Sequence, residues 1–421
     1  MKINTFRAFK SRNYRLYFGG QSVSLIGTWM QKTAVSWVVF SLTHSTFMLG
    51  VSLFASQFPS FLLSLWGGVV SDRYNRYKVL LATQIASMMQ ASALTLLIFL
   101  SRYNVWEILG LSVVLGTINA FDVPARQALV YEMINDKDDL PNALALNSSM
   151  VNLSRIIGPG IAGFVLEYAG DGFCFMSNAL SFIAVIGSLL MMKLPPYQPK
   201  ARTKNAFGEL KEGLSYVKKT PSIGFVVLMI GLVSLFVLPY NTLIPYFARI
   251  VFKGNATTFG VIDSAIGFGA FVGALYLASL KTGSNLKLVL AINTLILGAG
   301  LVLFSHQHIY LIALLFAMIT GFGMMSQNAI SNTLIQTIVE PSMRGRVISL
   351  YVTVFFGMQP LGGLLVGSVS KLIGTPDTIL LEGIAGVIIG LIHYRYLRKE
   401  KLKSRQNVIA HEEAEVQAQK T

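Results

Sequence analysis

GGVVSDRYNRYKV, residues 67–79, is a short basic segment between two long apolar stretches. Residues 33–71 contain no Asp, Glu, Lys or Arg, and a second uncharged stretch follows Val79. About 20 apolar residues in a helix cross the hydrocarbon core of a bilayer. Residues 33–71 can therefore hold the end of one spanning helix and the whole of the next. We expect a tight turn at the membrane surface that carries Asp72, Arg73, Arg76 and Lys78.

The composition extends this interpretation to the whole chain. Hydrophobic residues make up 53% of the 421 residues and charged residues only 13%, whereas soluble proteins carry about 25% charged residues. The first 15 residues are basic and aromatic, without the apolar core and small-residue cleavage site of a signal peptide. We therefore expect a polytopic membrane protein with no removable leader.

Hydropathy predicts twelve spanning helices, at approximately 15–42, 47–70, 78–100, 104–126, 141–168, 172–194, 222–250, 257–280, 286–305, 308–335, 345–371 and 376–397. They divide the chain into an N-terminal six-helix bundle (1–194), a cytoplasmic linker (195–221) and a C-terminal six-helix bundle (222–398). The charged tail, residues 399–421, is expected to be disordered.

Lysine and arginine placement predicts the orientation. If the N-terminus is cytoplasmic, 28 of the 34 basic residues lie on the cytoplasmic side, four lie outside, and Lys32 and Arg155 lie within spans. Basic loops face the cytoplasm, so both termini are predicted to be cytoplasmic. The formal net charge of +15 is therefore a topology signal, and we expect no nucleic-acid partner.

The linker and the two halves carry weaker patterns. Phe207, Leu210, Leu214 and Val217 recur at helical spacing, which predicts either an amphipathic helix on the inner membrane surface or a plain tether. Pro159 and Pro360 lie 201 positions apart, and residues 45–51 resemble residues 256–261. Such echoes indicate a duplicated unit with a binding site between its copies, near the middle of the membrane.

Cysteine and histidine offer no metal or redox chemistry. Cys174 is the one cysteine, so no disulfide can form within the chain, and the five histidines lack metal-ligand spacing. We expect no metal and no cofactor. An enzyme would also need a cluster of nucleophile, base or metal ligands at one membrane face, and we find none, so we do not expect an enzyme.

The spacing Gly68-x-x-x-Asp72-Arg73-x-x-Arg76-x-Lys78 resembles the signature loop between spans 2 and 3 of the major facilitator superfamily of secondary transporters. Asn75 stands where that family usually has Gly, and Asn also tolerates a left-handed backbone. The resemblance implies an all-α membrane protein of twelve helices in two pseudo-symmetric six-helix bundles. The expected mechanism is then rocker-switch alternating access, in which the two bundles rock about a shared site that opens to one side of the membrane at a time.

The same resemblance implies a gate at the cytoplasmic surface. Span 11 opens near Ser342, a candidate N-cap, and a helix N-terminus attracts an anion by about 0.3–2 kcal/mol. By resemblance, Asp72 approaches this N-terminus when the transporter faces outward. The alternative is that the charges only mark the inner surface. The expected gate residues are Gly68, Asp72, Arg73, Arg76, Arg344 and Arg346.

Charged residues also lie within predicted spans, and Lys32, Arg155 and Asp263 are the candidates for a role in transport. Lys32 lies about 25 Å and Arg155 about 21 Å along their helices, where an isolated cation costs roughly 2.5–3.5 kcal/mol. The two cations indicate an anionic or strongly polar substrate group, and Asp263 is the candidate proton carrier; structural pairing is the alternative. We expect Glu382 and the pair Asp122–Arg126 to be structural. Lys32 is predicted to share a polar, cavity-facing stripe with Gln21, Ser24, Thr28 and Ser36.

Gly158, Pro159 and Gly163 allow span 5 to bend and to approach another helix closely. The segment resembles a span 5 motif of antiporters in this superfamily, which implies export; ordinary helix packing is the alternative. Further segments resemble bacterial exporters of the enterobactin-exporter type: 27–31 (GTWMQ), 122–127 (DVPARQ), 140–147 (LPNALALN) and 212–217 (EGLSYV). Lys32 stands where that subgroup is expected to have an uncharged polar residue.

We therefore predict a monomeric, proton-driven exporter of a siderophore or amphipathic drug-like molecule in the bacterial cytoplasmic membrane. Uptake of a small organic anion and lipid flipping are the alternatives. The predicted substrate-binding residues are Trp29, Gln31, Lys32, Gln57, Asn152, Arg155, Tyr240, Asn241, Gln327 and Tyr351.

Overall fold

The computed structural model describes residues 6–100, 104–194, 206–280 and 285–418, and every regular element in these ranges is helical. The first group comprises η1 (Arg7–Lys10), α1 (Arg12–Thr43), α2 (Thr46–Arg73), α3 (Arg76–Phe99), α4 (Val105–Met133), η2 (Lys137–Asp139), α5 (Leu140–Tyr168) and α6 (Asp171–Leu190). The second comprises α7 (Ala206–Lys219), α8 (Pro221–Phe236), η3 (Leu238–Leu243), α9 (Ile244–Tyr246), η4 (Phe247–Val251), α10 (Ala256–Ala278), α11 (Leu286–Ser305), α12 (Tyr310–Ile338), α13 (Arg344–Ile373) and α14 (Thr375–Ala418).

The basic turn lies where the sequence predicts it, between α2 and α3. Asn75 is the N-cap of α3, and its side-chain oxygen accepts a hydrogen bond of 3.2 Å from the backbone N–H of Lys78. The backbone of Asn75 is extended, with φ −61°, so the left-handed conformation that we considered is not used. Asn suits the position because its short side chain reaches the free N–H groups of the first helical turn.

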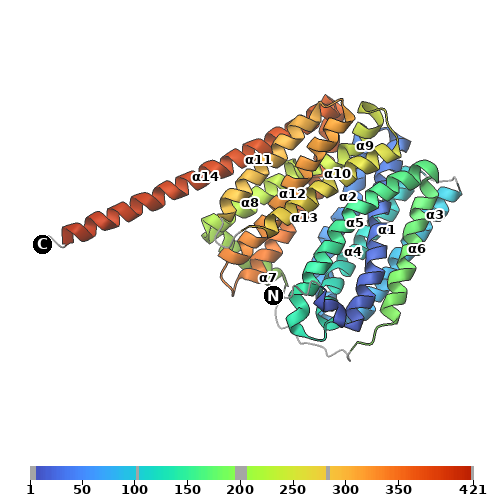
Figure 1. The fold of residues 1–421 in the computed structure, drawn as a ribbon, viewed down its shortest axis with the longest axis horizontal. Coiled ribbons are helices and arrows are strands. Elements are labelled where there is room, and N and C mark those ends of the chain that lie inside the picture. Colours follow the sequence, from blue (N-terminus) through green and yellow to red (C-terminus); the bar gives the residue numbers. More distant parts are fainter. Residues whose placement is uncertain (1–5, 101–103, 195–205, 281–284, 419–421) are drawn as a thin grey trace.

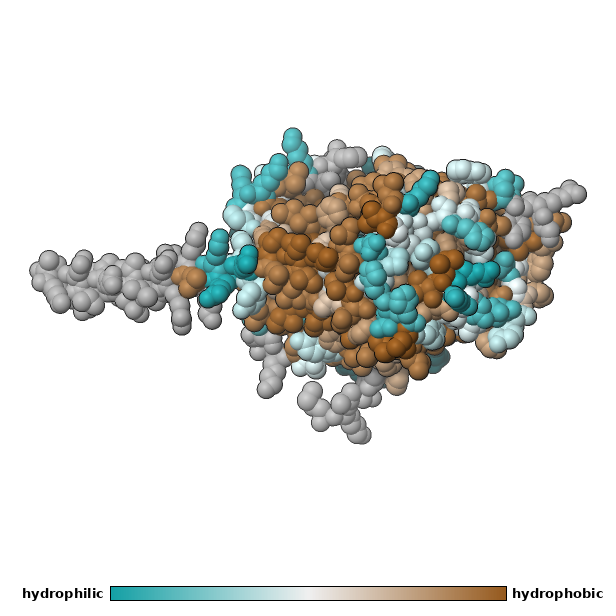
Figure 2. Space-filling model, turned by 90° about the horizontal axis from the view of Figure 1, so that it is seen from above, coloured by the Kyte–Doolittle hydropathy of each residue, from teal (hydrophilic) through white to brown (hydrophobic). Residues whose placement is uncertain are grey.

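Eleven helices of the described chain are long and apolar enough to cross a membrane. α1 has 32 residues and packs against α2, α5 and α6, but its polar side chains, Lys32 among them, keep it out of this set. A count of twelve therefore stays a prediction. Broad hydrophobic areas cover much of the surface in Figure 2, and Leu311 and Leu372 are 75% and 82% exposed. Apolar surface on this scale is suited to lipid.

Two groups of helices, α1–α6 and α8–α14, meet along two pairs, α5 with α10 and α2 with α13 (Figure 1). Both pairs approach closely through glycine. A Cβ on Gly163 would lie 2.6 Å from the Ala256 carbonyl oxygen, and a Cβ on Gly50 would overlap the Gly363 carbonyl oxygen. The repeated sequences noted above thus lie at the two equivalent contacts between the halves.

These contacts lie toward one end of the bundle. We call the end that holds the start of α1, the 73–76 turn and the start of α13 the basic end. The α5–α10 contacts begin at Gly163, near the opposite end, and reach as far as Arg155. A Cβ added at Gly267 would lie 3.0 Å from the Arg155 carbonyl oxygen. From there the two groups diverge toward the basic end, where α7 lies (Figure 1).

The span after α7 is not one continuous α-helix. α8 is followed by the 3-10 turn η3, by the short α9 and by η4, which is a π-helix. Pro239 and Pro245 explain part of this irregularity, because proline removes a backbone N–H from the helical ladder. The irregular part carries Tyr240 and Asn241, and short non-α segments of this kind are common at functional sites.

The segments outside the spans differ from the expectation in one case. α14 continues to Ala418, so most of the tail that we expected to be disordered, 399–421, is drawn as a helix that projects from the bundle (Figure 1). The linker does form a helix, α7. Its Val217 is 7% exposed and packs with Ile223 and Val347, while a Cβ on Gly213 would lie 2.9 Å from the Arg346 carbonyl oxygen. α7 therefore packs on α13. Residues 195–205 of the predicted linker lie outside the described residues.

Candidate functional site

The three charges predicted within the spans come together in space. Lys32 on α1 and Arg155 on α5 flank the Trp29 ring: the Lys32 Nζ lies 4.8 Å and the Arg155 Cζ 5.7 Å from the ring centroid. Asp263 on α10 is close enough for both cations to act on its carboxylate. A cation over an indole face gains up to about 2 kcal/mol when it is desolvated. Trp29 therefore holds two like charges near each other, which a purely apolar side chain would not do.

Asp263 balances these cations without a direct ion pair. Its Oδ2 accepts a hydrogen bond of 3.4 Å from the Thr33 hydroxyl, and Asn241 is a second polar neighbour. The charges of Lys32 and Arg155 both act on the carboxylate, but among the described residues neither cation lies within 4.0 Å of it. The carboxylate consequently keeps hydrogen-bonding capacity for a proton or a ligand.

Arg155 also faces the second group of helices. One of its guanidinium N–H groups donates to the Met324 Sδ at 3.4 Å, and the Tyr240 hydroxyl donates to the same sulfur at 3.8 Å. A thioether is a weak acceptor. The Arg155 charge is therefore poorly compensated by hydrogen bonds, and it is available to an acceptor group of a ligand.

The site is accessible although it lies deep in the molecule. The side chain of Lys32 is exposed at its surface, and those of Arg155 and Asp263 are half-buried. The charged groups of Lys32 and Asp263 nevertheless have protein around them on most sides. The predicted polar stripe on α1 is only partly correct. Thr28, Lys32 and Ser36 are at least partly accessible, but Gln21 and Ser24 are 2% and 1% exposed. In that part of α1 the helix packs against its own half, so no accessible space remains.

Aromatic side chains close the site on the side away from the basic end. Trp37 stacks on Phe259 at 6.0 Å between ring centroids, and Phe40 meets Tyr246 edge to face at 6.1 Å. Both pairs join the two halves. Residues 37–40 of α1 are all buried, so α1 is covered beyond Lys32 on the side away from the basic end.

The span 5 residues hold the site together, as the sequence predicts in its packing interpretation. A Cβ on Gly158 would lie 2.5 Å from the Trp29 Cβ, and a Cβ on Gly260 would overlap the Pro159 carbonyl oxygen. Thr257 donates a hydrogen bond of 3.3 Å to the Gly163 carbonyl oxygen. α5 can thus lie against α1 and α10 at once, which brings Arg155 next to Trp29. Whether the motif also sets the direction of transport stays a prediction.

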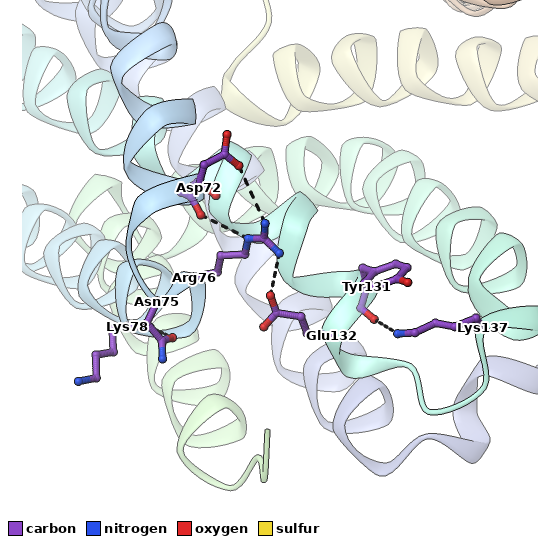
Figure 3. A network of polar contacts seen from close by, with 8 residues as sticks. Asp72, Asn75, Arg76, Lys78, Tyr131, Glu132 and Lys137 are labelled. Carbon is purple, nitrogen blue, oxygen red and sulfur yellow. Dashed lines mark hydrogen bonds and ion pairs between the residues drawn. The ribbon is translucent and has the colours of Figure 1, made fainter. Parts of the chain in front are cut away.

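The expected gate residues of the 73–76 turn form a network within the N-terminal half (Figure 3). Arg76 donates to the Glu132 carboxylate at 2.7 Å and to the Ser71 carbonyl oxygen at 3.3 Å, and it lies 3.9 Å from Asp72. Arg73 is exposed. In this conformation Asp72 therefore has a basic partner on its own half.

One detail of the predicted gate is wrong, the N-cap of α13, and the gate role of Gly68 stays a prediction. Gly68 has nothing within 4 Å of a Cβ, whereas a Cβ on its neighbour Gly67 would overlap the Ala120 carbonyl oxygen, so the close packing of α2 on α4 depends on Gly67. Ser342 is not the N-cap of α13: Met343 occupies that position and no side chain caps the helix.

The two arginines at the start of α13 differ in their surroundings. Arg344 is exposed. Arg346 donates to the Glu212 carboxylate of α7 at 2.9 Å and lies 2.8 Å from the Met343 sulfur. Arg346 therefore ties the linker helix to α13.

The remaining predicted binding residues are scattered. The Gln31 amide is used within the N-terminal half, with Gln90 at 3.0 Å and Asn178 at 2.7 Å, so in this conformation it faces α3 and α6. Tyr351 is similarly engaged, because its hydroxyl donates to Asn328 within the C-terminal half.

Three of the other candidates, Asn152, Asn241 and Gln327, lie on elements that carry the site, and Gln57 lies on α2. Asn152 is one turn from Arg155 and donates to the Ser148 carbonyl oxygen at 2.9 Å, and Gln327 is one turn from Met324 and buried. Gln57 and Asn241 each have a buried side-chain oxygen without a hydrogen-bond partner among the described residues. These two oxygens could accept hydrogen bonds from a ligand.

Sequence reasoning missed several residues of the site and gate. Thr33 and Met324 look like ordinary span residues, and nothing in the sequence separates them from their neighbours. Glu132 had a signal, because an acidic residue at the basic end of a span is a natural partner for an arginine of the adjacent turn. The Gln31–Gln90–Asn178 network could not be found without knowing which helices pack together.

The chain is similar to known transport proteins over its full length. A sequence profile of the family described as "transmembrane secretion effector" matches residues 3–420. The chain is 26% identical over 396 residues to the staphyloferrin A transporter of Staphylococcus aureus, covering 92% of this chain and 97% of that protein. It is 22% identical over 398 residues to macrolide efflux protein A of Streptococcus pyogenes, with 91% and 96% covered. It is 25% identical over 381 residues to the enterobactin exporter EntS of Salmonella typhi, with 90% and 91% covered.

Solved structures of transporters share the fold. A POT family transporter in complex with 5-aminolevulinic acid superposes with a TM-score of 0.73 at 12% identity, covering 92% of this chain and 96% of the other. A bacterial homologue of the human lysosomal transporter Spinster, in an inward-facing and occupied conformation, gives 0.71 at 14% identity, with 92% and 97% covered. At these identities the likeness concerns the fold alone.

Proposed function

Because this chain belongs to the major facilitator family of transmembrane secretion effectors, we propose that it exports an amphipathic small molecule in exchange for protons by alternating access. A siderophore or a drug-like compound is the proposed substrate class. The relatives compared above are siderophore and macrolide transporters and exporters, and none is named as an enzyme. The observation that carries the proposal is the accessible cluster of Trp29, Lys32, Arg155 and Asp263, at the closed end of the space between the halves.

The cluster has the groups that a polyfunctional amphipathic substrate needs. Trp29 offers an aromatic face, Lys32 and Arg155 offer donors and positive charge, and Asp263 offers an acceptor. A binding cavity is usually mostly apolar with a few placed polar groups. Gln57, Asn152, Asn241 and Gln327 are the proposed additional polar contacts, and Tyr240 is the proposed aromatic wall behind Arg155.

We propose that the basic end faces the cytoplasm, because basic segments of membrane proteins remain on that side. Both termini are then cytoplasmic, and the membrane is the bacterial cytoplasmic membrane. The space around Lys32 is in that orientation open to the cytoplasm and closed to the outside by the Trp37–Phe259 and Phe40–Tyr246 pairs. This is the conformation in which an exporter takes up its substrate.

Asp263 is the proposed proton carrier. A substrate donor group and a proton cannot occupy the same carboxylate oxygen, so the two compete for Asp263. In the state open to the cytoplasm the proton leaves and the substrate binds; in the state open to the outside a proton displaces the substrate. Each cycle then moves a proton inward and a substrate molecule outward.

Uptake of a small organic anion is the second candidate, and the two cations favour it. The cluster carries a net charge of +1 with Asp263 ionised and +2 with Asp263 protonated. A purely anionic substrate would therefore bind better after protonation, and proton and substrate would move together. The two candidates predict opposite effects of Asp263→Asn, a neutral analogue, on substrate affinity: weaker binding for the exporter and tighter binding for the anion importer.

A lipid flippase and a multimeric site are less well supported. The cluster is built by α1, α5, α10, α12 and η3 of one chain, so a monomer suffices. A flippase would need lipid access to this cluster, and α5 and α10 pack against each other beside it through Gly163 and Gly260.

Inside-out vesicles with an imposed pH gradient test the proposal directly. Candidate siderophores and macrolides are offered outside, and accumulation is compared between wild type, Lys32→Gln and Asp263→Asn. Lys371→Gln and Glu167→Gln are matched controls, because both side chains are exposed and far from the cluster. We expect more than tenfold loss in the two cluster variants and none in the controls. Wild-type accumulation that ignores the gradient for every compound would refute proton antiport.

A further inference from the structure

Glu382 is a buried carboxyl group with no hydrogen-bond partner in the part of the chain that the structure describes. It lies on α14, is 4% exposed, and neither of its oxygens has a hydrogen-bond partner among the described residues. An ionised carboxylate in such surroundings would be strongly destabilised unless it were paired. Sequence reasoning took Glu382 for a structural residue, but a structural carboxyl normally uses its acceptors, and this one uses none.

In the described chain, the helices that pack around Glu382 carry their Lys and Arg residues near the helix ends. α14 packs against α8, η3, α11 and α13, and neither α8 nor η3 contains Asp, Glu, Lys or Arg. The basic residues of the other two helices, Lys287 on α11 and Arg344, Arg346 and Lys371 on α13, lie near the helix ends. Tyr240 of η3 is a titratable group close enough for the Glu382 charge to act on it. On α14 itself, Asp377 lies five residues before Glu382 and His393 eleven residues after it.

Helix packing explains how Glu382 and Tyr240 meet. α8 and α14 are antiparallel, and a Cβ on Gly386 would lie 3.4 Å from the Val237 side chain. One turn back along α14 from Gly386 is Glu382, and one turn forward from Val237 are residues 240–241. Because the two segments are antiparallel, Glu382 therefore lies opposite residues 240–241. A Cβ on Gly383 would lie 2.7 Å from the Val302 backbone nitrogen, so α11 closes the other side. Glu382 is therefore enclosed between α11 and the irregular η3 turn.

η3 lies between two carboxyl groups. Tyr240 is influenced by both Asp263 and Glu382, and its neighbour Asn241 approaches the Asp263 carboxylate. The buried Asn241 Oδ1 has no hydrogen-bond partner in the described part of the chain. A short 3-10 turn thus carries two adjacent polar side chains between the accessible cluster and an enclosed acid.

We propose that Glu382 is a second proton-binding site, which holds a proton in the conformation described here and exchanges it with Asp263 through the η3 turn. In this conformation the Tyr240 hydroxyl donates to the Met324 Sδ, so the exchange requires η3 to move until that hydroxyl lies between the two carboxyl groups. The transfer is then balanced: an O–H bond of Glu382 breaks, its proton passes to the Tyr240 hydroxyl oxygen, and the Tyr240 proton forms the new O–H bond on ionised Asp263. No electron moves and the total charge is unchanged. Glu382 then carries the negative charge until the next proton arrives. This inference rests on the proposed proton antiport.

Infrared spectroscopy of the purified protein tests the protonation without any transport. A protonated carboxyl in apolar surroundings has a carbonyl-stretch band well separated from carboxylate and amide bands, and this band shifts in D₂O. We expect such a band at neutral pH in wild type, its loss in Glu382→Gln, and its retention in the control Glu167→Gln. An unchanged band in Glu382→Gln would overturn the proposal.

A transport assay distinguishes a role of Glu382 in proton coupling from a purely structural role. Glu382→Gln keeps the shape of a protonated acid but cannot release a proton. We expect near wild-type substrate exchange without a gradient, and at least a tenfold loss of accumulation driven by the pH gradient, with partial recovery in Glu382→Asp. Gradient-driven accumulation at the wild-type level in Glu382→Gln would refute the role. If wild type itself ignores the gradient, the proposed antiport fails, and the infrared result still decides whether Glu382 holds a proton.

Discussion

The Thr33 hydroxyl donates a hydrogen bond of 3.4 Å to the Asp263 carboxylate and thereby joins α1 of one half to α10 of the other. The contact lies beside the cation cluster and on the closed side of the accessible space. It links the state of the proposed proton carrier to the packing of the halves, because a protonated Asp263 accepts this hydrogen bond less strongly than an ionised one.

Thr33→Val tests this link. The change removes the donor with little change in shape, and a hydrogen bond to a charged group is worth about 1.5–3 kcal/mol. We expect a shift of the conformational equilibrium away from the state open at the basic end, by up to about tenfold given the long distance. Cysteine-labelling rates on the two sides of the membrane measure it. Thr28→Val is the control, since its hydroxyl bonds only the Ser24 carbonyl oxygen of the same helix; an equal effect there would contradict the link.

Gly163→Leu should separate the halves at their closed end. A Cβ at this position would lie 2.6 Å from the Ala256 carbonyl oxygen and 3.0 Å from the Gly260 Cα, and the backbone atoms cannot move aside cheaply. We expect loss of the conformation described here and at least tenfold slower transport, read from labelling rates and vesicle flux. Gly187→Leu is matched, because nothing lies within 4 Å of its Cβ. Unimpaired transport in Gly163→Leu would show that α5 and α10 do not need this close approach.

The variants Gly67→Ala and Gly68→Ala distinguish a role in helix packing from the gate role that the sequence motif gives to Gly68. The Gly67 Cβ would overlap the Ala120 carbonyl oxygen, whereas the Gly68 Cβ meets nothing within 4 Å. Overpacking costs typically about 1–3 kcal/mol, so Gly67→Ala should lower thermal stability in detergent and Gly68→Ala should not. A transport defect in Gly68→Ala at normal stability would place the role of Gly68 in the other conformation. Equal stability losses would contradict the packing described here.

The fold could be predicted from the sequence because a bilayer leaves few choices. Uncharged stretches of about 20 residues must be helices that satisfy their own backbone, and the basic turn at 72–78 identified the superfamily. The full-length family match confirms both. The close contacts could not be predicted to the residue: the motif favoured Gly68, yet Gly67 faces α4, since one residue turns a helix by 100° and only packing decides which neighbour is buried.

The sequence allowed the charged residues of the candidate site to be predicted, but not the side chains that contact them. A charged side chain within a span is costly, so Lys32, Arg155 and Asp263 stand out by sequence. Gln31 did not differ in type from Gln57, but it faces α3 and α6 and is consumed by Gln90 and Asn178. Glu382 was undervalued because a carboxyl in a peripheral span was assumed to have a partner. Partners depend on helix faces, which periodicity leaves open when nearly every residue is apolar.

Asp72→Asn tests the proposed gate in the conformation that is not described here. In the present one Asp72 lies 3.9 Å from Arg76, which also donates to Glu132 at 2.7 Å, so the loss of its charge costs little. If Asp72 instead stabilises the start of α13 when the basic end closes, the closed state loses about 0.3–2 kcal/mol. We expect the equilibrium to shift toward the state open at the basic end, with slower labelling from the opposite side. Asp138→Asn, at an exposed site of the same end, should leave the labelling rates unchanged. If Asp72→Asn also leaves them unchanged, the turn only marks the membrane surface, and the closing contact must lie elsewhere, for which Arg346 and Glu212 are the next pair to examine.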